Sequence, residues 1–477
     1  MSAAKKPTVV ILGAGPAGVG GAQRLRLENR ADVIVFEQAP VPGGNAGSFE
    51  LSGMRVDFGS HRLHPACDPK ILADIRGFLG DDLLDRPRHG RIGLRRRWIH
   101  FPLKPADLML RLDPGFALGS LRDMLTKPFR NKADADRSYG DFLKVNLGKT
   151  IYDSFYSPYA WKMWGYAPTE LSSIQAKRRV SASSFLKLIR KVMNSVPGFK
   201  PKGSGRFFYP RHGYGQISEA YASSASALGA DIRYGRRVTR LVPPGSAGDS
   251  WVVEAVGPDG EERLECDYLW STIPISLLAR LIGSGIPAGV QEAAAKIESR
   301  AMLLIYLTLP VEQFTEFDAH YFPSADLRIT RLSEPKNYSD LGEPSGATVI
   351  CAELPCALDD EWWKMTDAQL GDLVAGNLAR AGVPLPVQPS RVHVRRLRQA
   401  YPVYTIGYEK WFDVLDSWVA TLPRLLSYGR QGLFAHDNTH HALAMAYAAA
   451  ECLEPSGFNA ARWAGYREEF EKHIVED

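Results

Sequence analysis

Three closely spaced glycines near the N-terminus are the first residues whose spacing indicates a specific chemistry. They lie in the segment Gly13-Ala14-Gly15-Pro16-Ala17-Gly18. In a turn that joins a strand to a helix, Gly13 would allow the tight bend, Gly15 would let the backbone approach a pyrophosphate, and Gly18 would let the helix pack close to the strand. The free amides at the start of that helix would face the phosphate charge. The segment therefore predicts a site that binds a dinucleotide.

The elements around this segment have the order that such a site requires. Thr8–Leu12 is a continuous apolar, β-branched run, which is typical of a strand buried on both faces. A helix is expected to follow the glycines as far as Leu27, and Asp32–Phe36 is a second buried strand. Glu37 closes this strand and can accept hydrogen bonds from ribose hydroxyls, which favours an unphosphorylated ribose. A glycine-rich turn without a ligand is the alternative, and the strand–turn–helix context makes it the weaker one.

Composition and charge exclude several other classes of protein. The chain has 477 residues and a net charge of +5, with 45% hydrophobic and 23% charged residues, and at roughly 100–200 residues per domain it can form two or three domains. The mild positive charge suits an anionic small ligand, and no nucleic-acid recognition motif accompanies it. The five cysteines are scattered without a CxxC pair, so we expect reduced thiols, no disulfide framework and no metal site. We expect neither a signal peptide nor a membrane-spanning segment, and therefore a cytoplasmic protein.

Further segments resemble two-domain flavoproteins of the amine-oxidase type. The turn Gly43-Gly44-Asn45 follows Glu37 closely, like the Gly-Gly turn that passes along the cofactor in those proteins. Val238 lies in a segment similar to the strand whose valine backbone contacts the adenine, and Cys266–Pro274 is similar to the strand that re-enters the cofactor domain. The resemblance implies that the dinucleotide is FAD.

The resemblance continues near the C-terminus. Gly432–Asn438 looks like the last strand of the cofactor domain, and an alanine-rich helix from His441 to Cys452 follows it. In these families that helix points its N-terminus at the flavin. The resemblance implies that Asp437 and Asn438 hold the ribityl chain or the pyrophosphate.

The fold implied is α/β, with a Rossmann-type FAD-binding domain interleaved with a mixed α+β substrate-binding domain. Cofactor segments occur at both ends and in the middle of the chain, so both domains are discontinuous. The expected FAD-binding domain comprises residues 1–75, 206–285 and 425–477, and the expected substrate-binding domain comprises residues 76–205 and 286–424.

Within this superfamily the chain resembles UDP-galactopyranose mutase and its protoporphyrinogen-oxidase-like relatives over most of its length. Lys162-Met163-Trp164 and Lys177-Arg178 match the mutase spacing, which implies substrate contacts for Trp164 and Arg178. The segments around Arg331 and Tyr401 resemble those that bind a diphosphate, a role for which arginine is well suited. Two features depart from the pattern. The mutase has a Gly-Arg-Leu segment near the cofactor, whereas the stretch from Gly432 to His441 contains no arginine. The region from Pro105 to Tyr139 also looks longer than in compact bacterial mutases.

Histidines supply the candidate proton-transfer groups. His61 and His64 lie in a loop that resembles the mutase loop beside the flavin, and histidine titrates near neutral pH. His436 belongs to an HxxxHH cluster with His440 and His441. A flavin-facing role for one of these three, a metal site at the i, i+4 pair, and helix capping by Asp437 or Asn438 are the alternatives. The sequence predicts His61, His64 and His436 as catalytic residues and no metal.

A basic amphipathic stretch, Phe185–Val192, precedes a glycine-rich linker. It could touch a membrane surface or cover the substrate. A solvated helix and loop is the interpretation that we favour.

Three hypotheses for the function follow. The first is an FAD-dependent oxidoreductase that transfers a hydride between flavin N5 and a small polar substrate, sugar-like or phosphorylated. The second is a redox-neutral, UDP-galactopyranose-mutase-like isomerase that uses reduced FAD as a nucleophile on a nucleotide-sugar. The third is a scaffold that binds flavin without turnover, which the many aromatic and charged residues of the substrate segments disfavour.

Overall fold

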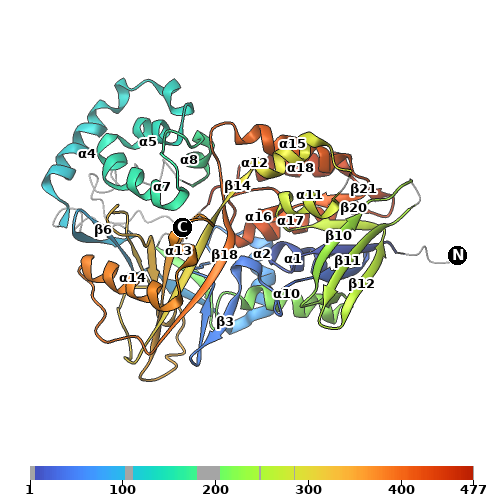
Figure 1. The fold of residues 1–477 in the computed structure, drawn as a ribbon, viewed down its shortest axis with the longest axis horizontal. Coiled ribbons are helices and arrows are strands. Elements are labelled where there is room, and N and C mark those ends of the chain that lie inside the picture. The colour runs from blue at the N-terminus through green and yellow to red at the C-terminus, as the bar shows by residue number, and fades with distance from the viewer. Residues whose placement is uncertain (1–5, 103–110, 180–204, 247–248, 284, 476–477) are drawn as a thin grey trace.

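The computed structural model describes residues 6–102, 111–179, 205–246, 249–283 and 285–475. Two sheets form its framework, a parallel sheet of five strands and a mixed sheet of seven. Figure 1 shows the parallel sheet on the side of the N-terminus and the mixed sheet on the opposite side. The α/β fold expected from the sequence is confirmed.

The parallel sheet has the strand order β19-β13-β1-β2-β9 and takes strands from both ends and the middle of the chain. Its central strand β1 (Thr8–Leu12) pairs with β2 (Asp32–Phe36) and with β13 (Tyr268–Ser271). Strands β9 (Asp231–Arg233) and β19 (Leu425–Ser427) form the two edges. Helix α1 (Pro16–Leu27) joins β1 to β2, so the predicted βαβ unit is present.

Both faces of β1 are covered, because successive side chains of a strand point to opposite faces. Val9 and Ile11 belong to one apolar core, and Val10 and Leu12 belong to another. The first core is closed by α1, α2 (Pro69–Leu79), α10 (Gln216–Ala227), α17 (Thr439–Cys452) and α18 (Ala460–Phe470). The second is closed by β10 (Arg237–Val242), β11 (Trp251–Gly257), β12 (Gly260–Cys266), α11 (Ile275–Ile282), α12 (Ala288–Lys296) and α15 (Tyr408–Thr421).

The mixed sheet has the strand order β18-β14-β17-β16-β15-β6-β7. Its strands are β6 (Gly90–Leu94), β7 (Arg97–Phe101), β14 (Glu298–Leu309), β15 (Ala319–Tyr321), β16 (Arg331–Ser333), β17 (Thr348–Cys356) and β18 (Arg391–Val403). Helix α14 (Asp367–Arg380) packs Leu370, Val374 and Leu378 against one face. The hairpin β3–β4 (Ser48–Leu51 and Met54–Asp57) packs against the other.

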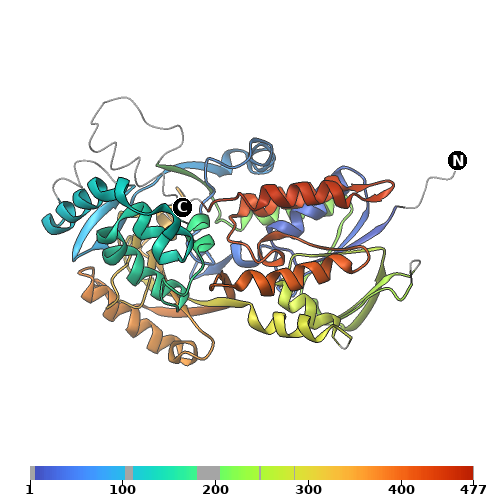
Figure 2. The same cartoon turned by 90° about the horizontal axis from the view of Figure 1, so that it is seen from above.

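A group of helices lies at the end of the mixed sheet that is far from the N-terminus (Figure 2). It comprises α4 (Pro114–Thr126), α5 (Tyr139–Leu147), α6 (Lys149–Ile151), α7 (Ser157–Trp164) and α8 (Ser173–Arg179). Trp164 and Leu171 of this group share an apolar core with Val403 of β18. Among the described residues, the other strands and α-helices are β5 (Leu83–Pro87), β8 (Arg206–Pro210), β20 (Leu453–Glu454), β21 (Gly457–Phe458), α13 (Glu361–Lys364) and α16 (Gly429–Gly432).

One predicted element is wrong. Gly432 is the last residue of α16, and Leu433–Asn438 is the loop between α16 and α17. The last strand of the parallel sheet is β19, which ends before both. The short apolar run of the loop is buried as expected, but the backbone amides of Leu433 and Ala435 donate to the carbonyls of Gly429 and Arg430. Because these amides bond within a local turn, they are not available to a neighbouring strand.

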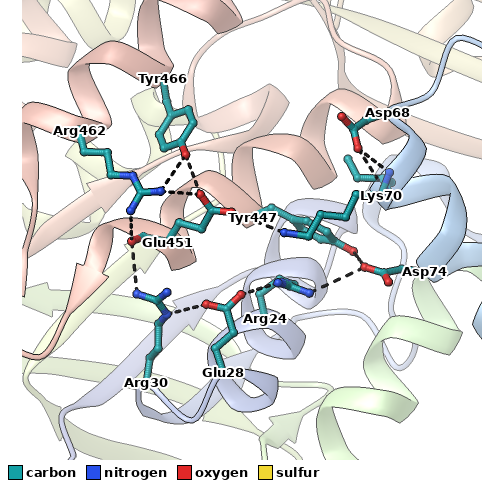
Figure 3. Close-up of polar contacts among 11 residues, drawn as sticks. Arg24, Glu28, Arg30, Asp68, Lys70, Asp74, Tyr447, Glu451, Arg462 and Tyr466 are labelled. Carbon is teal, nitrogen blue, oxygen red and sulfur yellow. Dashed lines mark hydrogen bonds and ion pairs between the residues drawn. The ribbon is translucent and has the colours of Figure 1, made fainter.

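Polar contacts connect the helices on one side of the parallel sheet (Figure 3). The Tyr447 hydroxyl of α17 donates to Asp74 of α2 at 2.6 Å. Glu451 of α17 accepts from Arg462 at 2.9 Å and from Tyr466 at 2.6 Å, both of α18. Helices from distant parts of the sequence are therefore connected by side-chain hydrogen bonds as well as by their apolar faces.

No helix among the described residues is long and apolar enough to cross a bilayer. The amphipathic stretch Phe185–Val192 lies outside the described residues. All five cysteines are free and buried.

Two helical glycines allow a matched test of the packing around α1. A methyl group at Gly21 would overlap the buried hydroxyl of Tyr428, whereas one at Gly77, on the exposed side of α2, meets no atom within 4 Å. We expect Gly21→Ala to destabilise the protein by about 1–3 kcal/mol through overpacking. We expect Gly77→Ala to stabilise it by about 0.5–1 kcal/mol, because alanine has the higher helix propensity. Thermal unfolding should show a decreased Tm for Gly21→Ala and an increased Tm for Gly77→Ala. An increased Tm for Gly21→Ala would contradict the packing described.

Candidate active site

A cavity of about 2100 Å³ is lined by residues of both sheets. Pockets for a single small ligand usually measure about 300–1,000 Å³, so this one has room for a dinucleotide and a substrate together. Its parallel-sheet side includes Gly13, Gly15, Glu37, Val238 and Thr272. Its other side is rich in aromatic and arginine side chains, including Tyr156, Tyr159, Trp164, Arg179, Tyr321, Arg331, Tyr401 and Arg430.

The glycines at the start of α1 fit the approach of a pyrophosphate. Gly13 has a φ of +96°, which favours glycine, and a methyl group at Gly18 would overlap the carbonyl oxygen of Gly13. At Gly15 the nearest atom to an added methyl group is the Cα of Gly44, at 3.9 Å. Space is therefore left in front of the Gly15 backbone, where a phosphate can meet the amides at the start of α1. Pro16 and Ala17 also line the cavity there.

Glu37 is buried at the end of β2. Its carboxylate accepts hydrogen bonds at 2.8 Å from the backbone amides of Ala14 and Ala39, which fixes the side chain at the edge of the cavity. A carboxylate has acceptor capacity for more than these two bonds. Its position and charge suit ribose hydroxyls and disfavour a phosphorylated ribose.

The Gly-Gly turn packs directly on the glycine segment. The amide of Gly43 donates to the carbonyl of Ala14 at 2.9 Å, and a methyl group at Gly44 would lie 3.3 Å from the Cα of Gly15. The Asn45 side chain donates to the carbonyl of Gln399 in β18 at 3.0 Å. This turn therefore holds the cofactor side of the cavity against the mixed sheet. Together with the glycines and Glu37, it fits FAD.

Asp437 and Asn438 line the same cavity immediately before α17. Asn438 is the N-cap residue of α17, and its backbone amide donates to Nδ1 of His441 at 3.2 Å. The helix-capping alternative therefore holds for Asn438. The carboxylate of Asp437 has no solvent exposure.

The three predicted catalytic histidines are in different environments. His61 lines the cavity, where it stacks on Tyr214 and where Nε2 lies 2.9 Å from the carbonyl oxygen of Phe58. Burial lowers the pKa of His61, and the Asp57 carboxylate partly opposes this. His64 also lines the cavity, and its Nδ1 accepts from the amide of Ala66 at 3.1 Å.

His436 is placed differently from the expectation. It is fully buried, its ring packs against Trp164 and Tyr404, and it does not line the cavity. Nε2 lies 3.1 Å from the side-chain oxygen of Gln175. Burial, followed by the charges of nearby arginines, lowers its pKa well below the ordinary value. His436 therefore supports the wall of the cavity from behind.

The two neighbouring arginines at the end of α8 point in different directions. Arg178 points toward α18 and donates to the carbonyl of Phe470 at 3.2 Å, and it is not part of the cavity wall. Its neighbour Arg179 lines the cavity, with its guanidinium carbon 5.3 Å from the Trp164 ring centre and 5.2 Å from that of Tyr401. The reason is helix geometry, since adjacent residues of a helix point about 100° apart.

Arg430 is a cavity residue that the sequence analysis missed. It belongs to α16, and its guanidinium carbon lies 4.9 Å from the ring centre of Tyr401. It donates to the carbonyl of Ala400 at 2.8 Å. The pair Gly429-Arg430 lies just before the stretch from Gly432 to His441, where the resemblance placed the Gly-Arg segment.

Arg331 lines the cavity, but the carboxylate of Glu353 compensates its positive charge. Its Nε and one terminal nitrogen lie 2.9 and 2.8 Å from one carboxylate oxygen of Glu353. The amide of Ser60 donates to the same oxygen at 2.8 Å. Because Glu353 is almost fully buried, this pair is held firmly and adds little net charge to the cavity.

Comparisons with known proteins agree with this geometry. The family model described as flavin containing amine oxidoreductase matches residues 16–450. The crystal structure of a reduced UDP-galactopyranose mutase superposes with a TM-score of 0.80 at 19% identity, and covers 99% of this chain and 100% of that one. A putative protoporphyrinogen oxidase from Exiguobacterium sp. 255-15 gives a TM-score of 0.68 at 16% identity, over 94% and 98% of the two chains.

Curated relatives are similarly distant in sequence. The chloroplastic protoporphyrinogen oxidase of Oryza sativa subsp. japonica is 23% identical, over 96% of this chain and 88% of its own. The phytoene dehydrogenase of Streptomyces griseus is 27% identical, over 58% of this chain, and the match spans 56% of its own length. With the family model matching most of its length, the chain belongs to the flavin-containing amine oxidoreductase family, and its cofactor is FAD.

Proposed function

We propose that this chain is an FAD-dependent oxidoreductase whose substrate is a small anionic compound, sugar-like and phosphorylated, of the nucleotide-sugar class. Its family supports flavin-dependent chemistry on a small molecule. The substrate class is inferred from the side of the cavity that faces the mixed sheet.

The observation that carries this proposal is the arrangement of Arg179, Tyr401 and Arg430. Both guanidinium groups lie about 5 Å from the ring of Tyr401, and all three residues line the cavity. Within the described ranges, no carboxylate forms an ion pair with either arginine, in contrast to Arg331 and Glu353. Two uncompensated guanidinium groups favour an anion, and the fork geometry of arginine suits phosphate oxygens.

Aromatic side chains complete the proposed substrate side. Trp164 is almost fully buried and meets Tyr401 edge to face, with ring centres 5.8 Å apart. Tyr156, Tyr159 and Tyr321 line the same region. Rigid aromatic walls exclude water and offer faces for a base or a sugar ring to stack on.

Bound FAD would supply hydride transfer, and the protein would contribute orientation and proton transfer. Glu37 and the glycine segment would hold the adenosine and pyrophosphate, and Arg179 and Arg430 would orient the substrate by its phosphates. His61 and His64 are the histidines that could move a proton, because both line the cavity.

A redox-neutral mutase reaction is the second candidate. It is favoured by the likeness to UDP-galactopyranose mutase over the full length of both chains. At 19% identity this likeness concerns the fold, so the reaction needs its own test.

The two reactions can be separated under anaerobic conditions. Oxidised and dithionite-reduced protein would be incubated with UDP-galactopyranose and UDP-galactofuranose, and the products analysed by chromatography. The oxidoreductase proposal expects no interconversion in either state, and bleaching of the flavin by an oxidisable substrate of the same class. Interconversion that occurs only with reduced flavin would contradict the oxidoreductase proposal and support the mutase reaction.

Neighbouring arginines provide a matched pair for the anion site. Arg179→Ala should weaken the binding of UDP by about 1.5–3 kcal/mol, the range for a hydrogen bond to a charged group. Arg178→Ala, which removes the same charge one residue away, should leave the affinity almost unchanged. Isothermal titration calorimetry measures both, with Arg430→Ala as a second variant in the cavity. Equal losses for Arg178→Ala and Arg179→Ala would show a general charge effect and refute the proposed site.

Gly15 tests the position of the pyrophosphate. Its backbone conformation suits any residue, with φ −69° and ψ 176°, and no protein atom lies closer than 3.9 Å to an added methyl group. Gly15→Val should therefore fold normally but lose its flavin, because the side chain occupies the space of the pyrophosphate. The flavin absorbance per mole of protein gives the occupancy, and circular dichroism confirms the fold. A folded variant with full flavin content would contradict this position.

A further inference from the structure

Three potential metal ligands converge at the start of α17. They are Asp437 and His441, four residues apart in sequence, and His473, which follows α18. One ligand atom from each lies within 4.8 Å of the other two. We propose that this cluster binds a divalent transition-metal ion such as Zn²⁺.

The carboxylate of Asp437 points to a missing partner. Its side chain has no solvent exposure, and neither oxygen has a hydrogen-bond donor among the described residues. Nδ1 of His473 likewise has no hydrogen-bond partner there. A buried carboxylate is costly unless a positive charge compensates it, so an ion at this position would satisfy several groups at once.

The distances fit metal coordination better than direct hydrogen bonds. One oxygen of Asp437 lies 3.4 Å from Nδ1 of His441 and 3.3 Å from Nδ1 of His473. Hydrogen bonds between a charged donor and a carboxylate are shorter, at about 2.7–2.9 Å. Two ligands at about 2.0–2.1 Å from a tetrahedral Zn²⁺ are separated by about 3.3–3.4 Å, which is the spacing found.

Coordination by His441 would use a lone pair that is now in a hydrogen bond. Its Nδ1 accepts a hydrogen bond from the backbone amide of Asn438, so this nitrogen is unprotonated. Because an imidazole nitrogen has a single lone pair, binding of the ion would replace this amide contact. Two imidazoles and one carboxylate form a ligand set that suits Zn²⁺, with a fourth position left for water.

One adjustment is needed for both imidazoles to face a single ion. The rings of His441 and His473 stack nearly parallel, with centres 4.1 Å apart and planes at 14°. One ring must turn about χ2, a torsion that is broad in histidine. His473 lies in an irregular segment, so its ring can turn without disturbing a helix.

The ion would connect two parts of the cavity wall. Asp437 lines the cavity, and so do Ile474 and Val475, the residues directly after His473. The amide of Val475 already donates to the carbonyl of Arg178 at 2.8 Å. A metal at His473 would therefore fasten this segment to the start of α17. No metal is expected from the sequence, in which His473 lies far from the HxxxHH cluster.

The test uses the flavin-loaded protein without an affinity tag. After treatment with a chelator, Zn²⁺ binding is measured by equilibrium dialysis with elemental analysis, and Co²⁺ binding by its visible absorption beyond the flavin bands. We expect one ion per chain in the wild type and in His440→Ala, a matched control next to the cluster. Affinity should fall at least about tenfold in His441→Ala and in His473→Ala.

Three results would overturn the proposal: no stoichiometric binding by the wild type, unchanged affinity in His473→Ala, or an equal loss in His440→Ala. Flavin absorbance verifies that each variant is folded. His441→Ala also removes a capping contact of α17, whereas His473→Ala leaves that cap intact, so the latter variant keeps the test decisive.

Discussion

Strand β1 is buried on both faces at the centre of the parallel sheet, and this requirement shapes the rest of the structure. A strand that exposes neither face needs cover on both sides, and residues 8–57, which contain the βαβ unit and the hairpin β3–β4, cannot supply all of it. The cover comes from α10, α17 and α18 on one face and from β10–β12, α11, α12 and α15 on the other. Because these segments lie far apart along the chain, the residues that form the mixed sheet and its helices lie between them in the sequence.

The cavity follows from the same arrangement. Ligands of open α/β sheets bind beyond the carboxyl ends of the strands, and here Gly13 directly follows β1 and Glu37 directly follows β2. The mixed sheet closes this edge from the other side. The cavity lining carries charges of both signs, because Glu37 follows β2 whereas Arg179 of α8 and Arg430 of α16 have no ion-pair partner among the described residues. The buried Glu353 removes Arg331 from this balance.

Local patterns in the sequence were sufficient for the fold class, since the βαβ unit depends on residues adjacent in the chain. The direction in which individual side chains point was harder to predict from the sequence. Arg178 and Arg179 differ only in which side of α8 they occupy, and that depends on how the helix packs. The buried run Leu433–Ala435 has a composition that suits a strand, but its backbone amides form hydrogen bonds within a turn. The last strand was therefore expected too late in the chain, and Arg430 was missed. The domain boundaries and the roles of the site residues stay predictions.

The histidines show how burial divides residues of one type between different tasks. His436 is surrounded by Trp164, Tyr404 and nearby arginines, and its depressed pKa keeps it neutral, so it can orient Trp164 but cannot readily accept a proton. His61 is also kept neutral by burial, yet it faces the cavity. A carbonyl oxygen only accepts hydrogen bonds, so the contact with Phe58 places the ring proton of His61 on Nε2. Nδ1 of His61 then keeps its lone pair, which makes this residue the better placed of the two to act as a base.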